Sequence, residues 1–149
     1  MYRHILIPTD GSRLAAKAIK AGVRLAKALG AKVTGVYVVP RNPPPVYGGE
    51  GAVFVPEITP ERFAGAMKSA ATKALRAIET EARAAAVRCT TEAPADNLPW
   101  QGILRVARAR KCDAIVMASH GRGGLGGLIL GSETTRVLAH SKIPVLVVR

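Results

Sequence analysis

The sequence is poor in cysteine and in aromatic residues. It has two cysteines, Cys89 and Cys112, which lie in or beside apolar runs and lack C-x-x-C spacing. We therefore expect reduced core thiols and neither a zinc nor a redox site. Aromatic residues make up 4% of the chain. That is too few for a platform on which single-stranded nucleic acid stacks.

Long apolar runs are also missing. No segment approaches the roughly 20 apolar residues of a membrane span, and the first residues lead into a strand without the apolar core of a signal peptide. The chain has 149 residues, 48% of them hydrophobic and 21% charged. This size and composition predict a single domain, 1–149, with one core. We expect a soluble, cytoplasmic protein with no membrane partner.

Acidic residues are scarce, 10 against 22 basic ones, which gives a formal net charge of +12. Such a charge favours either nucleic acid or small anionic nucleotides. Cations recur every three or four residues in one predicted helix, a pattern typical of a solvated polar face. No base-reading module accompanies them, so we expect no specific nucleic-acid partner. These cations are Arg13, Lys17, Lys20, Arg24 and Lys27.

Apolar runs that end in turn residues alternate with amphipathic segments along the chain. Short runs that are apolar on both faces are typical of strands in a parallel sheet covered by helices. The alternation therefore predicts the α/β class. Strands are predicted at 4–10, 32–39, 87–92, 112–119 and 143–148, and helices at 12–29, at 59–86, from about 96, and at 132–140.

Several local features refine this prediction. The segment 87–92 is more polar than the other strands, so it is expected at an edge. The segment 40–56 is rich in proline and glycine and is expected to be a surface loop able to serve as a lid. Phe63 and Met67 begin the packing stripe of the second helix, and Trp100 is expected to anchor the third helix in the core.

A glycine-rich stretch, 119–132, follows a predicted buried strand and opens a helix. Backbone N–H groups at a helix start carry the positive end of its dipole, and glycine lets an anion come close to them. The stretch therefore predicts a cradle for a phosphorylated ligand.

Two common phosphate-loop motifs fit this stretch poorly. Residues 121–126 match G-x-G-x-x-G, but a dinucleotide fold needs an acid about 20 residues later. The chain has no acid after Glu133. Residues 126–131 have P-loop spacing, but Ser132 stands where the motif requires lysine.

The remaining pattern is Ala118-x2-Gly121-x9-Gly131-Ser132. It resembles the G-x2-G-x9-G-[S/T] nucleotide motif of the universal stress protein family, with Ala118 where the family has glycine. The resemblance covers 1–149, including Pro-Thr-Asp after the first strand, Val-Val-Pro after the second and the final Ile-Pro-Val-Leu-Val-Val. It implies a doubly wound, five-stranded parallel sheet with helices on both faces and strand order 3-2-1-4-5. It also implies an ATP-binding dimer.

The resemblance places a nucleotide site at the carboxyl ends of the strands, where the strand order reverses. Asp10 would contact the adenosine, the backbone of Val38 the adenine edge, and Met117 would flank the nucleoside. The glycine stretch and the helix after it would hold the phosphates. The implied site residues are Pro8, Thr9, Asp10, Val38, Met117, Ala118, His120, Gly121, Arg122, Gly131, Ser132, Glu133 and Thr134.

Metal binding is expected only through the nucleotide. Glu133 places a negative charge near the phosphates, which Mg²⁺ bound with ATP would offset. His4 and His140 have no companion at metal-ligand spacing, so no metal cage formed by the protein is expected.

The last predicted strand, Ile143 to Val148, is apolar on both faces and would be a sheet edge in the family order. An unpaired edge of this kind invites aggregation, so we expect a homodimer through it.

Two functions follow from these features. The leading one is an ATP-binding universal stress protein that acts as a regulatory, nucleotide-sensing dimer in the stress response. The alternative is an enzyme, a slow ATPase or a nucleotidyl transferase. Such chemistry needs a residue to orient the attacking group, and Asp10 or Glu133 offers a carboxylate near the phosphates. No catalytic residue is assigned.

Overall fold

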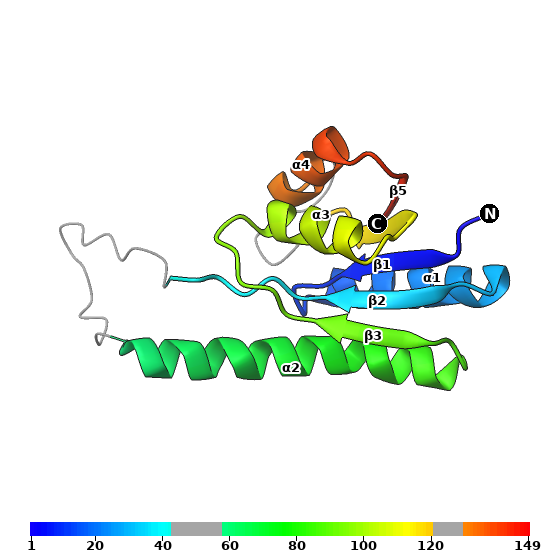
Figure 1. The fold of residues 1–149 in the computed structure, drawn as a ribbon. Coiled ribbons are helices and arrows are strands. Elements are labelled where there is room, and N and C mark those ends of the chain that lie inside the picture. Colours follow the sequence, from blue (N-terminus) through cyan, green and yellow to red (C-terminus); the bar gives the residue numbers. More distant parts are fainter. Residues whose placement is uncertain (43–57, 121–129) are drawn as a thin grey trace.

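The computed structural model describes residues 1–42, 58–120 and 130–149. In these ranges strands and helices alternate as predicted (Figure 1). The predicted loop at 40–56 falls outside the description from residue 43 onward. The elements are β1 (His4–Pro8), α1 (Arg13–Leu29), β2 (Lys32–Val36), α2 (Pro60–Ala84), β3 (Cys89–Glu92), α3 (Pro99–Ala109), β4 (Ala114–Ala118), α4 (Ser132–His140) and β5 (Val145–Val148).

The strands form one parallel sheet of five strands in the order β3-β2-β1-β4-β5. This confirms the predicted topology. Ile5 in the central strand β1 pairs with Val33 on one side and Ala114 on the other. The order reverses between β1 and β4, so the connections after these two strands leave in opposite directions and open a crevice at their carboxyl ends.

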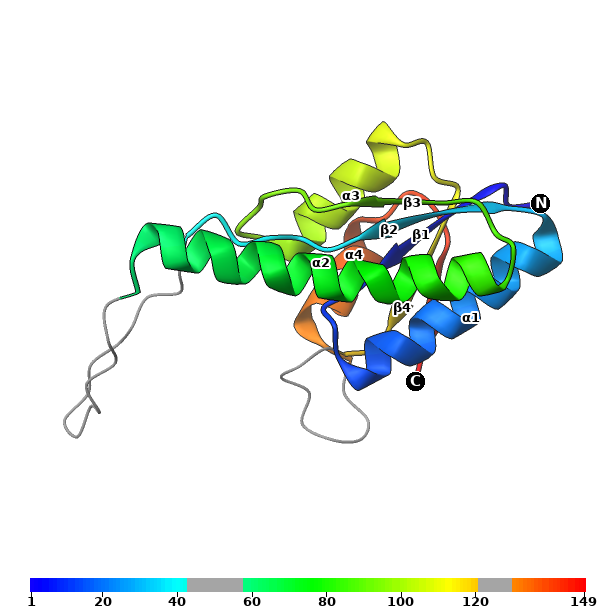
Figure 2. The ribbon, with the colours of Figure 1, turned by 90° about the horizontal axis from the view of Figure 1, so that it is seen from below.

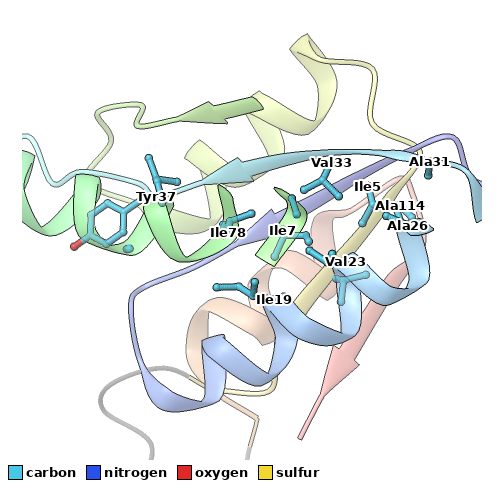
Figure 3. Packing of buried hydrophobic residues seen from close by; sticks show 14 of the residues in the cluster. Ile5, Ile7, Ile19, Val23, Ala26, Ala31, Val33, Tyr37, Ile78 and Ala114 are labelled. Atoms are coloured by element: carbon cyan, nitrogen blue, oxygen red, sulfur yellow. The ribbon is translucent and has the colours of Figure 1, made fainter. Parts of the chain in front are cut away.

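Helices cover both faces of the sheet. α1 and α2 lie on one face, and α3 and α4 lie on the other (Figures 1 and 2). Because successive side chains of a strand point to opposite faces, Ile5 and Ile7 join the first core and Leu6 joins the second. Figure 3 shows the first core, in which Val23 of α1 and Ile78 of α2 pack with the β1 isoleucines.

The two cysteine thiols are free, as expected. Cys112 is buried in the second core, and burial raises the pKa of its thiol to about 11. Cys89 is half-buried at the start of β3, and burial also raises its pKa. Both thiols therefore stay protonated and unreactive near neutral pH.

The predicted helix caps are present in the structure. The Ser12 hydroxyl accepts a hydrogen bond from the Ala15 N–H, and the Thr59 hydroxyl accepts one from the Arg62 N–H. Gly30 ends α1 with a φ of 64°, a left-handed conformation that glycine adopts without steric cost.

Two differences from the prediction have physical causes. β2 ends at Val36 instead of residue 39, because both of its neighbours end at the same level, β1 at Pro8 and β3 at Glu92. Phe63 and Met67 are half-exposed rather than packed. The first turns of α2 extend beyond the carboxyl ends of the strands, and the buried residues of this helix begin at Ala71 (Figure 1).

Candidate functional site

A cavity of about 410 Å³, which we call the carboxyl-end pocket, lies where the strand order reverses. Every predicted site residue within the described part of the chain lines it. Gly121 and Arg122 belong to the prediction but lie outside the described residues. The predicted residues that line the pocket are Pro8, Thr9, Asp10, Val38, Met117, Ala118, His120, Gly131, Ser132, Glu133 and Thr134.

The turn from β1 into α1 brings Asp10 to the pocket. The Thr9 N–H donates to the Val36 carbonyl, which holds the turn against β2. The Thr9 hydroxyl accepts from the Gly11 N–H at 3.1 Å, and Asp10 Oδ1 accepts from the Ser12 N–H at 2.9 Å. Asp10 is thus both a turn residue and a pocket residue.

Val38 presents its main chain to the pocket. The main chain of the next residue, Val39, faces the 94–96 segment that follows β3. Its N–H donates to the Pro94 carbonyl, and its carbonyl accepts from the Asp96 N–H. In a parallel ladder alternate residues turn these groups to opposite sides. The N–H and C=O of Val38 therefore face the side where β1 has already ended, and this side is the pocket.

The start of α4 supplies hydrogen-bond donors. Gly131 is the N-cap and has no side chain with which to cap the helix. Its own N–H donates to the Ser119 carbonyl at 2.8 Å. Within the described residues, the N–H groups of Ser132, Glu133 and Thr134 have no acceptor. They are the unpaired donors expected at a helix start, and they carry the positive end of its dipole.

Gly131 also packs closely against the residue that follows Ser119. A Cβ at position 131 would lie 3.0 Å from His120 Cα and 3.1 Å from its Cβ. Glycine therefore allows α4 to begin directly beside the end of β4. His120 is half-buried, and its Nδ1 lies 3.1 Å from the Ser119 hydroxyl.

Thr134 and Glu133 tie α4 to its neighbours. The buried Thr134 hydroxyl donates to the Ala118 carbonyl at 2.9 Å, which fixes α4 to the end of β4. Glu133 Oε2 accepts from the Trp100 N–H at 2.8 Å, and its Oε1 accepts from Arg136 at 3.2 Å. The Glu133 carboxylate thus caps α3 and stabilises its N-terminal dipole.

Sequence reasoning did not predict this cap. The sequence offered one indication of it: Leu98, at the N-cap position of α3, has a side chain that cannot accept a hydrogen bond, so the cap must come from another residue. The prediction started α3 near Asp96, but Asp96 accepts from the Leu98 N–H and pairs with Arg105 instead. Trp100 is half-buried beside the second core, with its ring 4.5 Å from that of His140.

Further wall residues were not predicted. They are mostly apolar, and their position in or beside predicted strands and on the inward faces of α1 and α3 was the signal that could have identified them. They add mostly apolar surface to a pocket that also holds the main chain of Val38 and the start of α4. These residues are Ala15, Val36, Tyr37, Pro40, Pro99 and Ile103.

Within the described residues, no group of three or more His, Cys, Asp and Glu side chains could hold a metal ion. Over the same residues, no helix combines the length and the apolar character that crossing a membrane requires.

Comparison with known proteins agrees with the fold. The model of the Universal stress protein family matches residues 1–149. The chain belongs to the universal stress protein family. It is 33% identical over 149 residues to Universal stress protein MJ0531 of Methanocaldococcus jannaschii, covering all of this chain and 83% of that protein.

Solved structures of other universal stress proteins share the fold. Universal stress protein UspA from Lactobacillus plantarum superposes with a TM-score of 0.78 at 25% identity, covering 99% of this chain and 98% of that one. The universal stress protein from Archaeoglobus fulgidus, solved in complex with dAMP, superposes with a TM-score of 0.68 at 19% identity, covering 99% of this chain and 98% of that one.

Proposed function

We propose that this protein is a cytoplasmic homodimer that binds ATP with Mg²⁺ and acts as a nucleotide sensor in the stress response. The nucleotide would lie in the carboxyl-end pocket. One observation carries the proposal: a single cavity combines the uncapped start of α4 with the main-chain donor and acceptor of Val38. Its volume of about 410 Å³ is in the usual range for small-ligand sites.

The adenine base would lie at the Val38 side of the pocket. Ile103 and the buried Met117 offer apolar surface to a planar ring. The main chain of Val38 offers one donor and one acceptor to the edge of that ring. Asp10 would contact the sugar of the adenosine.

The phosphates would lie at the start of α4. The N–H groups of Ser132, Glu133 and Thr134 and the exposed Ser132 hydroxyl are suited to a polyanion. Gly121 and Arg122 are part of the same proposal.

Magnesium would be held chiefly by the phosphates and by water, the usual arrangement for this ion. Both oxygens of the Glu133 carboxylate already accept hydrogen bonds from Trp100 and Arg136. We therefore assign no side chain of the described residues as a magnesium ligand.

The dimer would form through Ile143 to Val148. β5 is an edge strand, and the apolar side chain of Leu146 within it is 50% exposed. Pairing of this edge with its copy would cover that side chain and the unpaired main-chain groups.

Titration calorimetry with ATP and Mg²⁺ tests the nucleotide site. Ser132→Asp should weaken binding roughly tenfold to a hundredfold, the loss expected for about 1.5 to 3 kcal/mol at one charged contact. The exposed position and the first turn of the helix both tolerate an acid, so α4 should remain folded. Ser132→Asn is the matched control, equal in size but uncharged, and should lose much less.

Two further variants sharpen the test. Gly131→Val should also weaken binding, because its side chain would push against His120 beside the phosphates. Ala118→Gly, which restores the family motif, should bind as well as wild type or better. Absence of ATP affinity in the wild-type protein, or equal affinity in Ser132→Asp and Ser132→Asn, would show that the assigned site is wrong.

A further inference from the structure

The outward face of α1 carries only positive charge. Its sequence from Arg13 to Leu29 contains five cations and no acidic residue, and all five cationic side chains are exposed. We call this set the α1 cationic row. It consists of Arg13, Lys17, Lys20, Arg24 and Lys27.

Helix geometry aligns the row. At 3.6 residues per turn, the five positions fall within an arc of about 80°. From Arg13 to Lys27 the row runs for about 21 Å along the helix axis, at 1.5 Å per residue. The helix is held in place, because Ile19, Val23 and Ala26 are buried in the core between it and the sheet.

Within the described residues, no ion pair neutralises these charges. Across residues 1–42, 58–120 and 130–149, ion pairs join Arg105 to Asp96, Arg110 to Glu92 and Arg136 to Glu133, and none involves the row. Five unpaired cations on one line form a strongly positive ridge that attracts anions.

The surroundings of the row define the kind of anion. Ala16 and Ala28, which are exposed beside it, are small and let a charged surface approach. A helix that inserts into a membrane surface needs a free apolar face, but the apolar face of α1 is buried in the core, so only electrostatic contact with an anionic lipid surface is open to the row. The row lacks the amide and aromatic side chains that read base edges.

We infer that the α1 cationic row binds the phosphate backbone of duplex nucleic acid without sequence preference. A duplex carries one negative charge per roughly 1.7 Å of its axis, so a straight row of this length can reach several phosphates at once. The carboxyl-end pocket shares none of the row's residues, so this inference stands apart from nucleotide binding.

A matched pair of triple variants tests the inference. The first, Lys17→Gln, Lys20→Gln and Arg24→Gln, removes three charges from the row. The second, Lys68→Gln, Arg88→Gln and Lys111→Gln, removes two lysines and one arginine from exposed positions elsewhere. Both lower the net charge equally, and glutamine is nearly as good a helix former as lysine.

Fluorescence anisotropy with two labelled 20-base-pair DNA duplexes of unrelated sequence provides the measurement, over a range of salt concentrations. The wild type should bind both duplexes equally. The row variant should bind at least tenfold more weakly at low salt. Its slope of log K against log salt should be shallower by about 2.7, because each phosphate that the protein neutralises accounts for roughly 0.9 of that slope. The control variant should stay close to wild type.

Several results would overturn the inference: no duplex binding by the wild type at low salt, preference for one sequence, or equal losses in both variants. Binding of the same variants to vesicles that contain phosphatidylglycerol tests whether the row binds an anionic membrane surface. Row-dependent binding to the vesicles without binding to the duplex would assign the row to a membrane surface instead.

Discussion

His4, in the first position of β1, is a histidine built into the sheet. It is 6% exposed, and its Nε2 lies 2.8 Å from the Thr34 hydroxyl, which lies 3.1 Å from the Thr90 hydroxyl. Burial, followed by the positive charge of Lys32, lowers the pKa of His4 below its ordinary value of 6.5, although the nearby Asp113 opposes the shift. His4 is therefore neutral in the folded protein at neutral pH.

This histidine should make stability depend on pH. The unfolded chain takes up the proton more readily than the folded one, so the free energy of unfolding should fall as pH falls below about 6.5, by at most about 1.4 kcal/mol per pH unit. Urea unfolding between pH 7 and 5 provides the measurement. His4→Gln should flatten this dependence, and Lys32→Gln should flatten it less, because burial is the larger cause. An unchanged slope in His4→Gln would contradict the assignment.

At the residue scale, local hydrogen bonds were predictable and distant ones were not. The Ser12 and Thr59 caps join residues three apart, so a single motif specifies each. The bonds from Glu133 to Trp100 and from His4 to Thr34 join residues 33 and 30 apart. They exist only because the fold brings those elements together.

At the scale of elements, glycine positions show where helices need close contact. Among the described residues, no atom other than those of its chain neighbours and of the helix backbone lies within 4 Å of the place a Cβ on Gly65 in α2 would occupy. In α1, a Cβ on Gly22 would lie 2.7 Å from Ile7 Cδ1 and 3.3 Å from Val116 Cβ. Gly65 therefore only lowers the stability of α2, whereas Gly22 allows α1 to pack closely on the sheet.

Alanine at these two positions should act in opposite directions. Gly65→Ala should raise the free energy of unfolding by about 0.5 to 1 kcal/mol, because it restricts the unfolded chain without a clash. Gly22→Ala should lower it by about 1 to 3 kcal/mol, because the core around Ile7 must give way. Chemical denaturation of both variants decides the matter, and destabilisation by Gly65→Ala would mean that α2 has a contact at this position.

The elements themselves followed from the sequence because their apolar spacing is set locally. Their order in the sheet came from the family resemblance, and the structure confirms it. The end of β2 could not be predicted, because Val36 to Val39 continues as apolar, β-branched sequence. What ends the ladder there is the end of the two neighbouring strands, β1 at Pro8 and β3 at Glu92.

At the scale of the whole molecule, the exposed edge formed by β5 is the feature that bears on assembly. Leu146→Lys should shift the protein from dimer toward monomer, because it places a charge on the proposed interface. Leu98→Lys is the control, since Leu98 is 41% exposed but lies on a different element from β5. Light scattering at micromolar concentration gives the mass of each. A monomeric wild type, or a dimer that survives Leu146→Lys, would count against this interface.

Val38 gives the proposed nucleotide site a rule for choosing among bases. A base bound there would lie beside Val38, where β1 would lie if it continued beyond Pro8. It would meet the fixed main-chain donor and acceptor of Val38. Selection then depends on the order of donor and acceptor along the base. Adenine offers an amino donor beside a ring acceptor, and guanine offers the reverse order, which leaves buried groups unpaired. Because the main chain of Val38 makes this selection, a substitution of its side chain would change the affinity for the nucleotide more than the preference between adenine and guanine.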